Sequence, residues 1–330
     1  MAAERQRRAI EWPTVALASA IYSGWLGLTW FATALPWPIV FVAGAWLVAW
    51  HASLQHELIH GHPTRWPAIN RLIGLPSLIL FLPFDRYRAI HLTHHRDEHI
   101  TDPLEDPETM YWTAERWRGL GPTGRLVVRV TARLAGRLVV GPVWVIVRFL
   151  IRDARLLRRG EPKVWDAWIA HTVATAPVAV WAFGVCGIPV FQYLGCFVVP
   201  GMALMLLRSF AEHRAHDEAD RRTAIVERAP VLGALFLFNN LHLAHHERPG
   251  LAWYRLPAFY AAERERLLRK NGGLVYDGYG EIVRRFLFRA HDASVHPKFG
   301  GNQGSRTPAG SITNPYSAAD ATSHAATLPA

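Results

Sequence analysis

The sequence predicts an all-α integral membrane protein, with four transmembrane helices and a cytoplasmic helical cap that carries clusters of histidine. Three observations support this fold class. Hydrophobic residues make up 51% of the 330 residues and charged residues only 19%, long apolar stretches interrupt the charged sequence, and histidine occurs 17 times. This composition excludes a mostly disordered chain. The two cysteines, Cys186 and Cys196, are too few for a disulfide framework or a cysteine-built metal site.

Four apolar stretches are long enough to cross a bilayer, which takes about 20 apolar residues. They form two pairs, each joined by a very short hairpin, and we place them at residues 14–35, 37–55, 167–187 and 189–208. The alternative, buried helices of a soluble protein, usually has a polar face and a length of ~10–14 residues. With four membrane spans, residues 1–13 are expected to form a cytoplasmic N-terminus and residues 14–299 a single membrane domain.

The basic residues predict the orientation of these helices. Neither hairpin, at residues 36–38 and 187–189, contains a lysine or arginine, whereas basic residues are frequent at the other ends of the spans. By the positive-inside rule, both termini and the large middle segment are cytoplasmic. We expect a protein of the bacterial inner membrane. The formal charge of +10 then reflects this asymmetry, and we expect no nucleic-acid partner.

Three further segments lie outside the predicted spans. Residues 72–84 are apolar but contain two prolines, which favours a re-entrant or interfacial segment. Arginines at positions 125, 129, 133 and 137 predict one basic helix face that lies on an anionic leaflet. Residues 300–330 are rich in Gly, Ser, Thr, Ala, Asn and Pro, and we expect them to form a disordered tail.

Nine of the histidines fall into four short clusters beside or shortly beyond the apolar stretches. His56 and His60 are four residues apart, so they share one face if the second span continues as a helix. The other clusters are His91, His94 and His95, then His213 directly after the fourth span, and then His242, His245 and His246. A zinc ion takes three or four protein ligands, so nine candidate ligands indicate two metal ions. Imidazole suits Zn, Cu, Fe and Ni, and the ligands alone do not choose among them.

Two other classes of protein fit part of this pattern. An intramembrane zinc protease would use His56 and His60 as ligands and Glu57 as general base, but it leaves the other clusters unexplained. A metal transporter would hold its ion near the bilayer midplane, whereas these clusters lie beyond the ends of the spans. We expect the other histidines to be structural or exposed, although His62 or His216 could replace one of the nine.

Carboxylates adjoin several candidate ligands. Glu57, Glu212 and Glu247 each neighbour one of the nine histidines in the sequence. Metal-bound histidines usually donate their second ring N–H to a carboxylate or carbonyl, so these residues are candidates for orienting the ligands. The alternative is that they only balance nearby arginines.

The joint pattern H-x3-H, H-x2-H-H and H-x2-H-H resembles the membrane fatty acid desaturase and hydroxylase superfamily over roughly residues 14–290. His56 and His60 match its first histidine box, the cluster at residues 91–95 the second, and the cluster at 242–246 the third. His213 matches an additional ligand of acyl-CoA desaturases. The resemblance implies that these nine histidines hold two iron ions, that O2 is a co-substrate, and that no catalytic residue is needed beyond the metal ligands.

Two features bear on the position of the chain within that superfamily. Animal acyl-CoA desaturases have an Asn four residues before the additional histidine, whereas this chain has Ser209 at that position. Asn239, three residues before His242, is the candidate for a water-mediated contact in place of that Asn. The stretch at residues 253–257, WYRLP, is similar to one that follows the third box in bacterial carotenoid ketolases. We expect a desaturase of an acyl-lipid or acyl-thioester chain, with hydroxylation or ketolation of a lipid or carotenoid as the alternative.

The sequence contains no glycine-rich dinucleotide fingerprint. We therefore expect electrons from a separate protein, a ferredoxin, rubredoxin or cytochrome b5-like carrier with its reductase. A basic cytoplasmic face would attract such an acidic carrier. The other expected partners are the lipid or acyl substrate and the membrane lipid itself.

Overall fold

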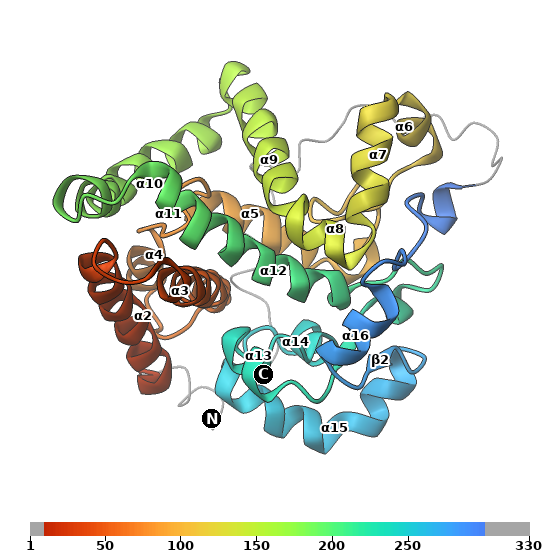
Figure 1. Ribbon diagram of the computed structural model, residues 1–330. Helices are drawn as coiled ribbons and strands as arrows, with labels where there is room; N and C mark the ends of the chain where they lie inside the picture. Colours follow the sequence, from red (N-terminus) through yellow and green to blue (C-terminus); the bar gives the residue numbers. More distant parts are fainter. Residues whose placement is uncertain (1–9, 301–330) are drawn as a thin grey trace.

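The structure is a computed structural model that describes residues 10–300. These residues form a mainly helical molecule with one small sheet (Figure 1), so the expected predominance of helix is confirmed. Residues 1–9 of the predicted N-terminal segment and residues 301–330 of the predicted tail lie outside the described residues.

Three helices are long and apolar enough to cross a membrane, and they correspond to the second, third and fourth predicted spans. The first of them is α3 (Trp37–Ile59). The second consists of α10 (Pro162–Ala179) and the π-helical segment η2 (Val180–Val185), and the third of α11 (Val190–Tyr193), the π-helical segment η3 (Leu194–Val198) and α12 (Val199–Glu212). Both α3 and α12 run about one turn beyond the predicted spans, which brings their last residues to the histidines.

The first predicted span forms α2, a helix of 20 residues at Trp12–Phe31. It is not among the three helices that meet the length and hydropathy requirement for a span. Although the helix carries no charged residue, its Trp, Tyr, Gly, Ser and Thr residues lower the mean hydropathy. A fourth crossing at this helix therefore stays a prediction.

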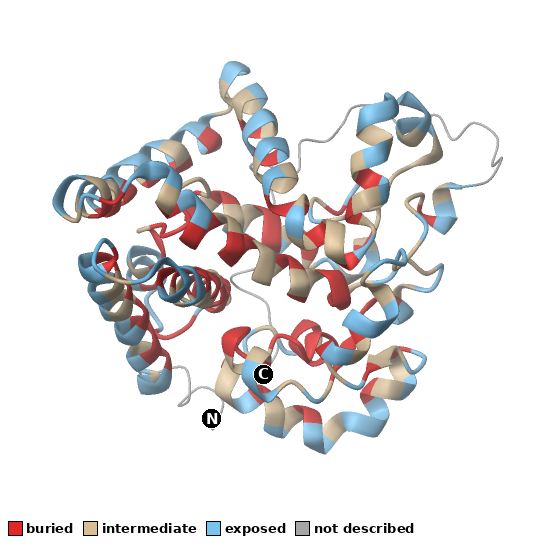
Figure 2. Cartoon of the chain, viewed as in Figure 1, coloured by how far each residue is buried: buried red, intermediate tan, exposed pale blue. Residues whose placement is uncertain are grey.

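The helix α3 lies at the centre of the apolar part and packs against α2, η3 and α12 (Figure 1). Two glycines allow this packing. A Cβ atom on Gly44 would lie 2.8 Å from the carbonyl oxygen of Cys196, and one on Gly201 would lie 2.6 Å from Cγ1 of Val48. Small residues at such crossings let helix backbones approach closely. Figure 2 shows buried residues concentrated along α12 and at α14 (His242–Glu247).

The apolar segment at residues 72–84 begins in α4 (Pro67–Gly74) and continues as irregular chain up to α5 (Phe84–His94). Side chains satisfy part of its backbone: Tyr193 donates to the carbonyl of Leu78 at 2.8 Å, and the ring of His171 lies 2.9 Å from the carbonyl oxygen of Leu80. Irregular backbone at membrane depth is tolerated where protein surrounds it in this way.

Buried ion pairing fixes the position of α5. Arg86 on α5 makes two hydrogen bonds, of 2.7 and 2.8 Å, to the carboxylate of Asp153 on α9 (Gly141–Arg158). The indole of Trp168 on α10 donates to the same carboxylate at 3.0 Å. The helix that carries the second histidine cluster is thereby attached to two neighbouring helices.

The prediction of one basic helix face at residues 125–137 is wrong. Residues 125–137 are divided between α7 (Pro122–Thr131) and α8 (Leu134–Val139), which follow a further short helix, α6 (Ala114–Gly119). Arg133 lies between α7 and α8 with an extended backbone. Arg137 is buried and donates to the carbonyl of Thr131 at 2.9 Å. The four arginines therefore do not form one exposed face.

The chain after α12 folds into short elements beside the ends of α3 and α12 (Figure 1). Strand β1 (Ile225–Val226) pairs in parallel with β2 (Val275–Tyr276) and contacts both α12 and α14, so it brings the helix that precedes His213 close to the helix that carries the third histidine cluster. This region also contains α13 (Pro230–Leu235), α15 (Leu256–Lys270), α16 (Tyr279–Phe286) and the 3-10 turns η4 (Ala219–Arg222), η5 (Trp253–Arg255) and η6 (Pro297–Phe299). One further 3-10 turn, η1 (Asp97–His99), follows α5.

Candidate metal centre

The structure gathers the nine candidate histidines into two adjacent groups. The five-histidine group consists of His56, His60, His91, His95 and His245. The four-histidine group consists of His94, His213, His242 and His246. Within each group, every ring offers one nitrogen that lies within 4.8 Å of the others. The rings of His95 and His246 stack with their centroids 4.3 Å apart, so the two groups are in contact.

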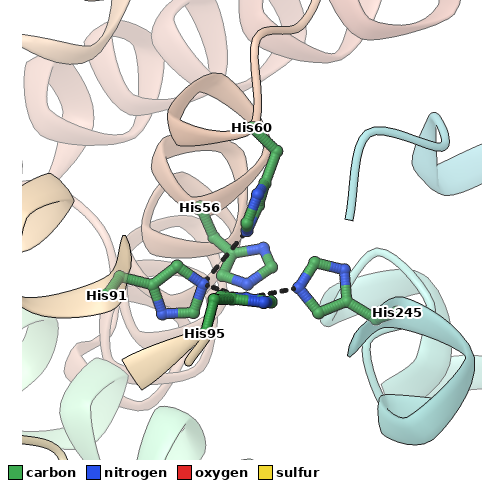
Figure 3. Close-up of side chains that lie close together, drawn as sticks. All are labelled: His56, His60, His91, His95 and His245. Carbon is green, nitrogen blue, oxygen red and sulfur yellow. Dashed lines mark hydrogen bonds between the residues drawn. The ribbon is translucent and has the colours of Figure 1, made fainter. Parts of the chain in front are cut away.

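Helical spacing explains how each H-x2-H-H box serves both groups. Residues four apart lie on one side of a helix, so His91 and His95 point into the five-histidine group while His94, between them, points into the other. The box on α14 is arranged in the opposite sense, with two rings in the four-histidine group and His245 in the five-histidine group. Figure 3 shows the five rings, from α3, α5 and α14, directed toward one another.

The ring nitrogens converge at ligand spacing. In the five-histidine group, Nε2 of His91 lies 3.1 Å from Nε2 of His60 and 3.0 Å from Nε2 of His95. In the four-histidine group, Nε2 of His213 lies 3.0 Å from that of His94 and 2.9 Å from that of His242. A metal–imidazole bond of about 2.1 Å, the value for zinc, places two ligands at a right angle about 3.0 Å apart. The observed separations fit rings that share one ion.

Hydrogen bonding supports the same conclusion for the four-histidine group. Nδ1 of His94 lies 3.0 Å from a carboxylate oxygen of Asp106, and Nδ1 of His213 lies 3.3 Å from the carbonyl oxygen of Arg222. Nδ1 of His242 lies 3.0 Å from Oδ1 of Asn239. Because these partners only accept, each Nδ1 carries the proton, and each neutral ring turns an Nε2 lone pair toward its neighbours.

Lone pairs cannot bond to one another, so these contacts need a cation. A proton on His94 would satisfy its contact with His213 but would leave the contact between His213 and His242 without a donor. In the five-histidine group, Nε2 of His56 is buried and has no hydrogen-bond partner within the described part of the chain. The side chains present therefore fit metal ions in both groups.

Burial keeps most of these rings neutral. It lowers the pKa of His95, His213 and His245 well below the usual value for histidine, and neighbouring histidines lower it further. Burial also opposes protonation of His94, but Asp106 and Glu108 raise its pKa to about 9. Neutral imidazole is the ligand form, and the carboxylates make the four-histidine group favourable for positive charge.

Asp106 and Glu108 are site residues that the sequence reasoning missed. Oε1 of Glu108 lies 3.1 Å from Nδ1 of His91. In the same way, Oδ1 of Asp106 lies 3.0 Å from Nδ1 of His94. The backbone N–H of Thr101 donates to Asp106 at 2.9 Å and holds the carboxylate in place. The signal was the acidic run E-D-P-E at residues 105–108, shortly after the second cluster, since metal-bound histidines commonly have such partners.

Two predicted orienting residues do contact a candidate ligand. Asn239 accepts from His242, as described, and its amide donates to Oε1 of Glu212 at 3.2 Å. Oε1 of Glu212 also lies 3.3 Å from Nδ1 of His242 and 2.8 Å from Nε of Arg208. Asn239 thus contacts the ring of His242 directly. Ser209 donates to the carbonyl of Leu206 at 3.4 Å, within its own helix.

The other two predicted orienting residues bond elsewhere. Glu247 accepts from Arg266 at 2.6 Å and Lys270 at 3.1 Å. Glu57 accepts the backbone N–H of Trp253 at 2.8 Å and lies 3.8 Å from Nε2 of His62. Consecutive helical residues do not face the same way, so a carboxylate next to a ligand in sequence points away from it. The orientation of Glu57 also argues against the zinc-protease alternative, in which it would face the metal.

The two alternative ligands lie outside both groups. His62 contacts the carboxylate of Glu11 at 2.8 Å, and Nδ1 of His216 accepts from the backbone N–H of Glu218 at 3.0 Å. Neither belongs to the five-histidine or the four-histidine group.

Helices long and apolar enough to span a membrane, ending at two adjacent groups of buried imidazoles, define a histidine-built candidate two-metal centre in a membrane protein. A family model for fatty acid desaturases matches residues 30–279. The chain belongs to the fatty acid desaturase family, and the predicted resemblance to that superfamily is confirmed. It is also similar to a beta-carotene ketolase from Paracoccus sp. (strain N81106 / MBIC 01143), at 26% identity over 259 residues, 73% of this chain and 90% of the ketolase.

Proposed function

We propose that this protein is a membrane-bound di-iron oxidoreductase that uses O2 and external electrons to oxidise a lipid chain, with fatty acid desaturation as the favoured reaction. The observation that carries the proposal is the convergence of nine imidazoles, six of them buried, into two adjacent groups. Membership of the fatty acid desaturase family supports both the class of reaction and the class of substrate.

Iron fits the ligand set better than zinc. Structural and catalytic zinc sites are mostly tetrahedral and take up to four protein ligands, whereas one group here offers five imidazoles. Iron accepts imidazole ligands and changes oxidation state. Two bound iron ions would supply the activation of O2 and the oxidising strength that an unactivated C–H bond requires, which side chains cannot provide.

The residues of this chain hold, orient and shield that centre. Asp106, Glu108 and Asn239 accept from Nδ1 of His94, His91 and His242, which fixes each ring and leaves Nε2 available. Six of the nine histidines are buried, and His60, His95 and His213 are partly exposed. Burial excludes bulk water and protects an oxidising site from side reactions.

A second candidate, ketolation or hydroxylation of a carotenoid or other lipid, has its own support. The similarity to the beta-carotene ketolase covers most of both chains. The stretch W-Y-R-L-P at residues 253–257 lies in η5 and the start of α15, and its first backbone N–H bonds to Glu57. Both reactions begin at a C–H bond of an apolar chain, so the same centre serves either.

The proposal includes an orientation and a partner. The distribution of lysine and arginine supports a cytoplasmic position for the histidine groups and both termini. We propose that an acidic electron carrier, of the ferredoxin, rubredoxin or cytochrome b5-like type, docks on this basic side and receives its own electrons from a reductase.

Two measurements test the proposed function. Protein purified from iron-supplemented cells should carry close to two iron ions per chain, and one zinc ion with activity that survives iron removal would refute it. Mass spectrometry of lipids and pigments from an expressing host identifies the reaction. Loss of two hydrogen atoms from an acyl chain indicates desaturation, and gain of oxygen on a carotenoid or acyl chain indicates the second candidate.

A further inference from the structure

A third cluster of metal-binding side chains lies outside the two histidine groups. Glu11, Glu57 and His62 each offer a ligand atom, and these atoms lie within 4.8 Å of one another. Glu11 directly precedes α2, Glu57 lies in the last turn of α3, and His62 follows α3. The backbone N–H of Glu11 donates to the carbonyl of Pro63 at 3.0 Å, which holds the two segments together.

The cluster places two carboxylates beside one imidazole. The side chains of Glu57 and His62 are each 7% exposed, and that of Glu11 is 21% exposed. Among residues 10–300, the ion-pair partner of both carboxylates is His62, and no lysine or arginine pairs with either. Carboxylates that leave water need a positive partner or a metal ion. Two carboxylates with a neutral imidazole would balance one divalent cation.

The two nitrogens of His62 differ in their surroundings. Nδ1 lies 2.8 Å from both carboxylate oxygens of Glu11, so its N–H donates to them. Nε2 is buried and has no hydrogen-bond partner among residues 10–300. It lies 3.8 Å from Oε1 of Glu57, which is too far for a hydrogen bond. Two ligand atoms with bonds of about 2.1 Å to one ion, at an angle of about 130°, are separated by this distance.

We propose that Nε2 of His62 and the carboxylate of Glu57 bind one divalent transition-metal ion, with Glu11 orienting the imidazole through Nδ1. A carboxylate behind a metal-bound histidine is a common arrangement, and mixed nitrogen and oxygen ligands suit ions such as Zn²⁺ and Mn²⁺. This site is separate from the two histidine groups and does not depend on their function.

The bound ion would have a structural role. Glu57 also accepts the backbone N–H of Trp253 at 2.8 Å, and the indole of Trp253 donates to Thr14 at 3.1 Å. An ion on Glu57 and His62 would therefore connect the start of α2, the end of α3 and the segment that follows the third histidine box.

Total metal per chain, measured with Zn²⁺ as the probe, tests the site. Full-length protein is purified in detergent, equilibrated with Zn²⁺, freed of excess and analysed for iron and zinc by mass spectrometry. We expect His62→Gln to hold one ion fewer than the wild type, and Zn²⁺ to raise its Tm less. His216→Gln, which changes a histidine outside all three clusters, should hold the same number as the wild type. Equal totals for the wild type and folded His62→Gln would overturn the proposal.

A second variant keeps the test decisive if His62→Gln does not fold. Glu11→Gln retains both proposed ligands and should weaken Zn²⁺ binding at this site by about 10–100-fold. Unchanged affinity in that variant would also contradict the proposal. If the histidine groups bind no metal, the proposed oxidoreductase function fails, but the difference of one ion between the wild type and His62→Gln would persist.

Discussion

At the scale of single residues, the hydrogen bond on one ring nitrogen determines what the other nitrogen can do. Asp106 accepts from Nδ1 of His94, so Nε2 of that ring carries the lone pair that meets His213 and, through it, His242. The nine histidines were predictable because their spacing repeats. Asp106 and Glu108 were not, because they belong to irregular chain whose path depends on tertiary contacts such as the bond from Thr101.

Asp106→Asn tests this orienting role. The amide keeps the size of the side chain but loses the negative charge that favours a cation beside His94. We expect metal affinity of the four-histidine group to fall by about 10–100-fold, measured as iron retained after dialysis against a chelator. Asp102→Asn is the matched control, since Asp102 is in the same segment and its carboxylate accepts from the backbone N–H groups of Leu104 and Glu105. Equal retention in both variants would contradict the assignment.

Removal of a single ring tests each group separately. His94→Ala takes one ligand from the four-histidine group, and His245→Ala takes one from the five-histidine group. Each variant should lose turnover and about one iron ion per chain while its membrane insertion stays unchanged. His216→Ala is the control. Normal activity in either ligand variant would show that the grouping described here is wrong.

At the scale of elements, length and apolarity predicted three helices within a few residues, because a membrane crossing leaves few alternatives. The four-residue spacing of the arginines predicted one continuous helix across residues 125–137, and this prediction failed between α7 and α8. Arg133 donates to the carbonyl of Phe288, and the N–H of Ala135 donates to the carbonyl of Leu287, so a distant segment breaks the helix there. The division of each histidine box between two groups was equally hidden, since it depends on how α5 and α14 are rotated against α3.

The crossing of α3 with η3 gives a prediction about packing. A Cβ on Gly44 would lie 2.8 Å from the carbonyl oxygen of Cys196 and 2.9 Å from Cδ1 of Phe197, and backbone cannot move aside cheaply. We expect Gly44→Ala to destabilise the protein by about 1–3 kcal/mol, seen as a lower Tm in detergent. Gly27→Ala is the control, because a Cβ there has no neighbour within 4 Å. If both variants melt alike, the close approach is not limiting.

At the scale of the whole molecule, the candidate metal centre joins parts of the chain that are far apart in sequence. The two groups draw rings from α3, from α5, from the end of α12 and from α14. Ions that bind the folded protein and not the unfolded chain add to stability by mass action. The centre is therefore expected to contribute to the stability of the fold as well as to the reaction.

Metal removal should accordingly lower the stability of the molecule. At about 100 times its Kd, an ion contributes about 2.7 kcal/mol, so chelation of both groups should lower the Tm clearly, and added Fe²⁺ should restore it. Protease digestion offers an independent measurement, because the segment that carries α14 should be cut faster without metal. An unchanged Tm after verified metal loss would mean that the rings are held in place by the protein alone.

The sharing of α5 and α14 between the two groups has a consequence for how the centre fills. When an ion binds in one group it fixes the rotation of both helices, and the remaining rings are then already placed for a second ion. The second ion pays less ordering entropy than the first. Binding of the two metal ions is therefore expected to be positively cooperative. When less than two equivalents of metal are added, most protein molecules should hold either no ion or two ions, and few should hold one.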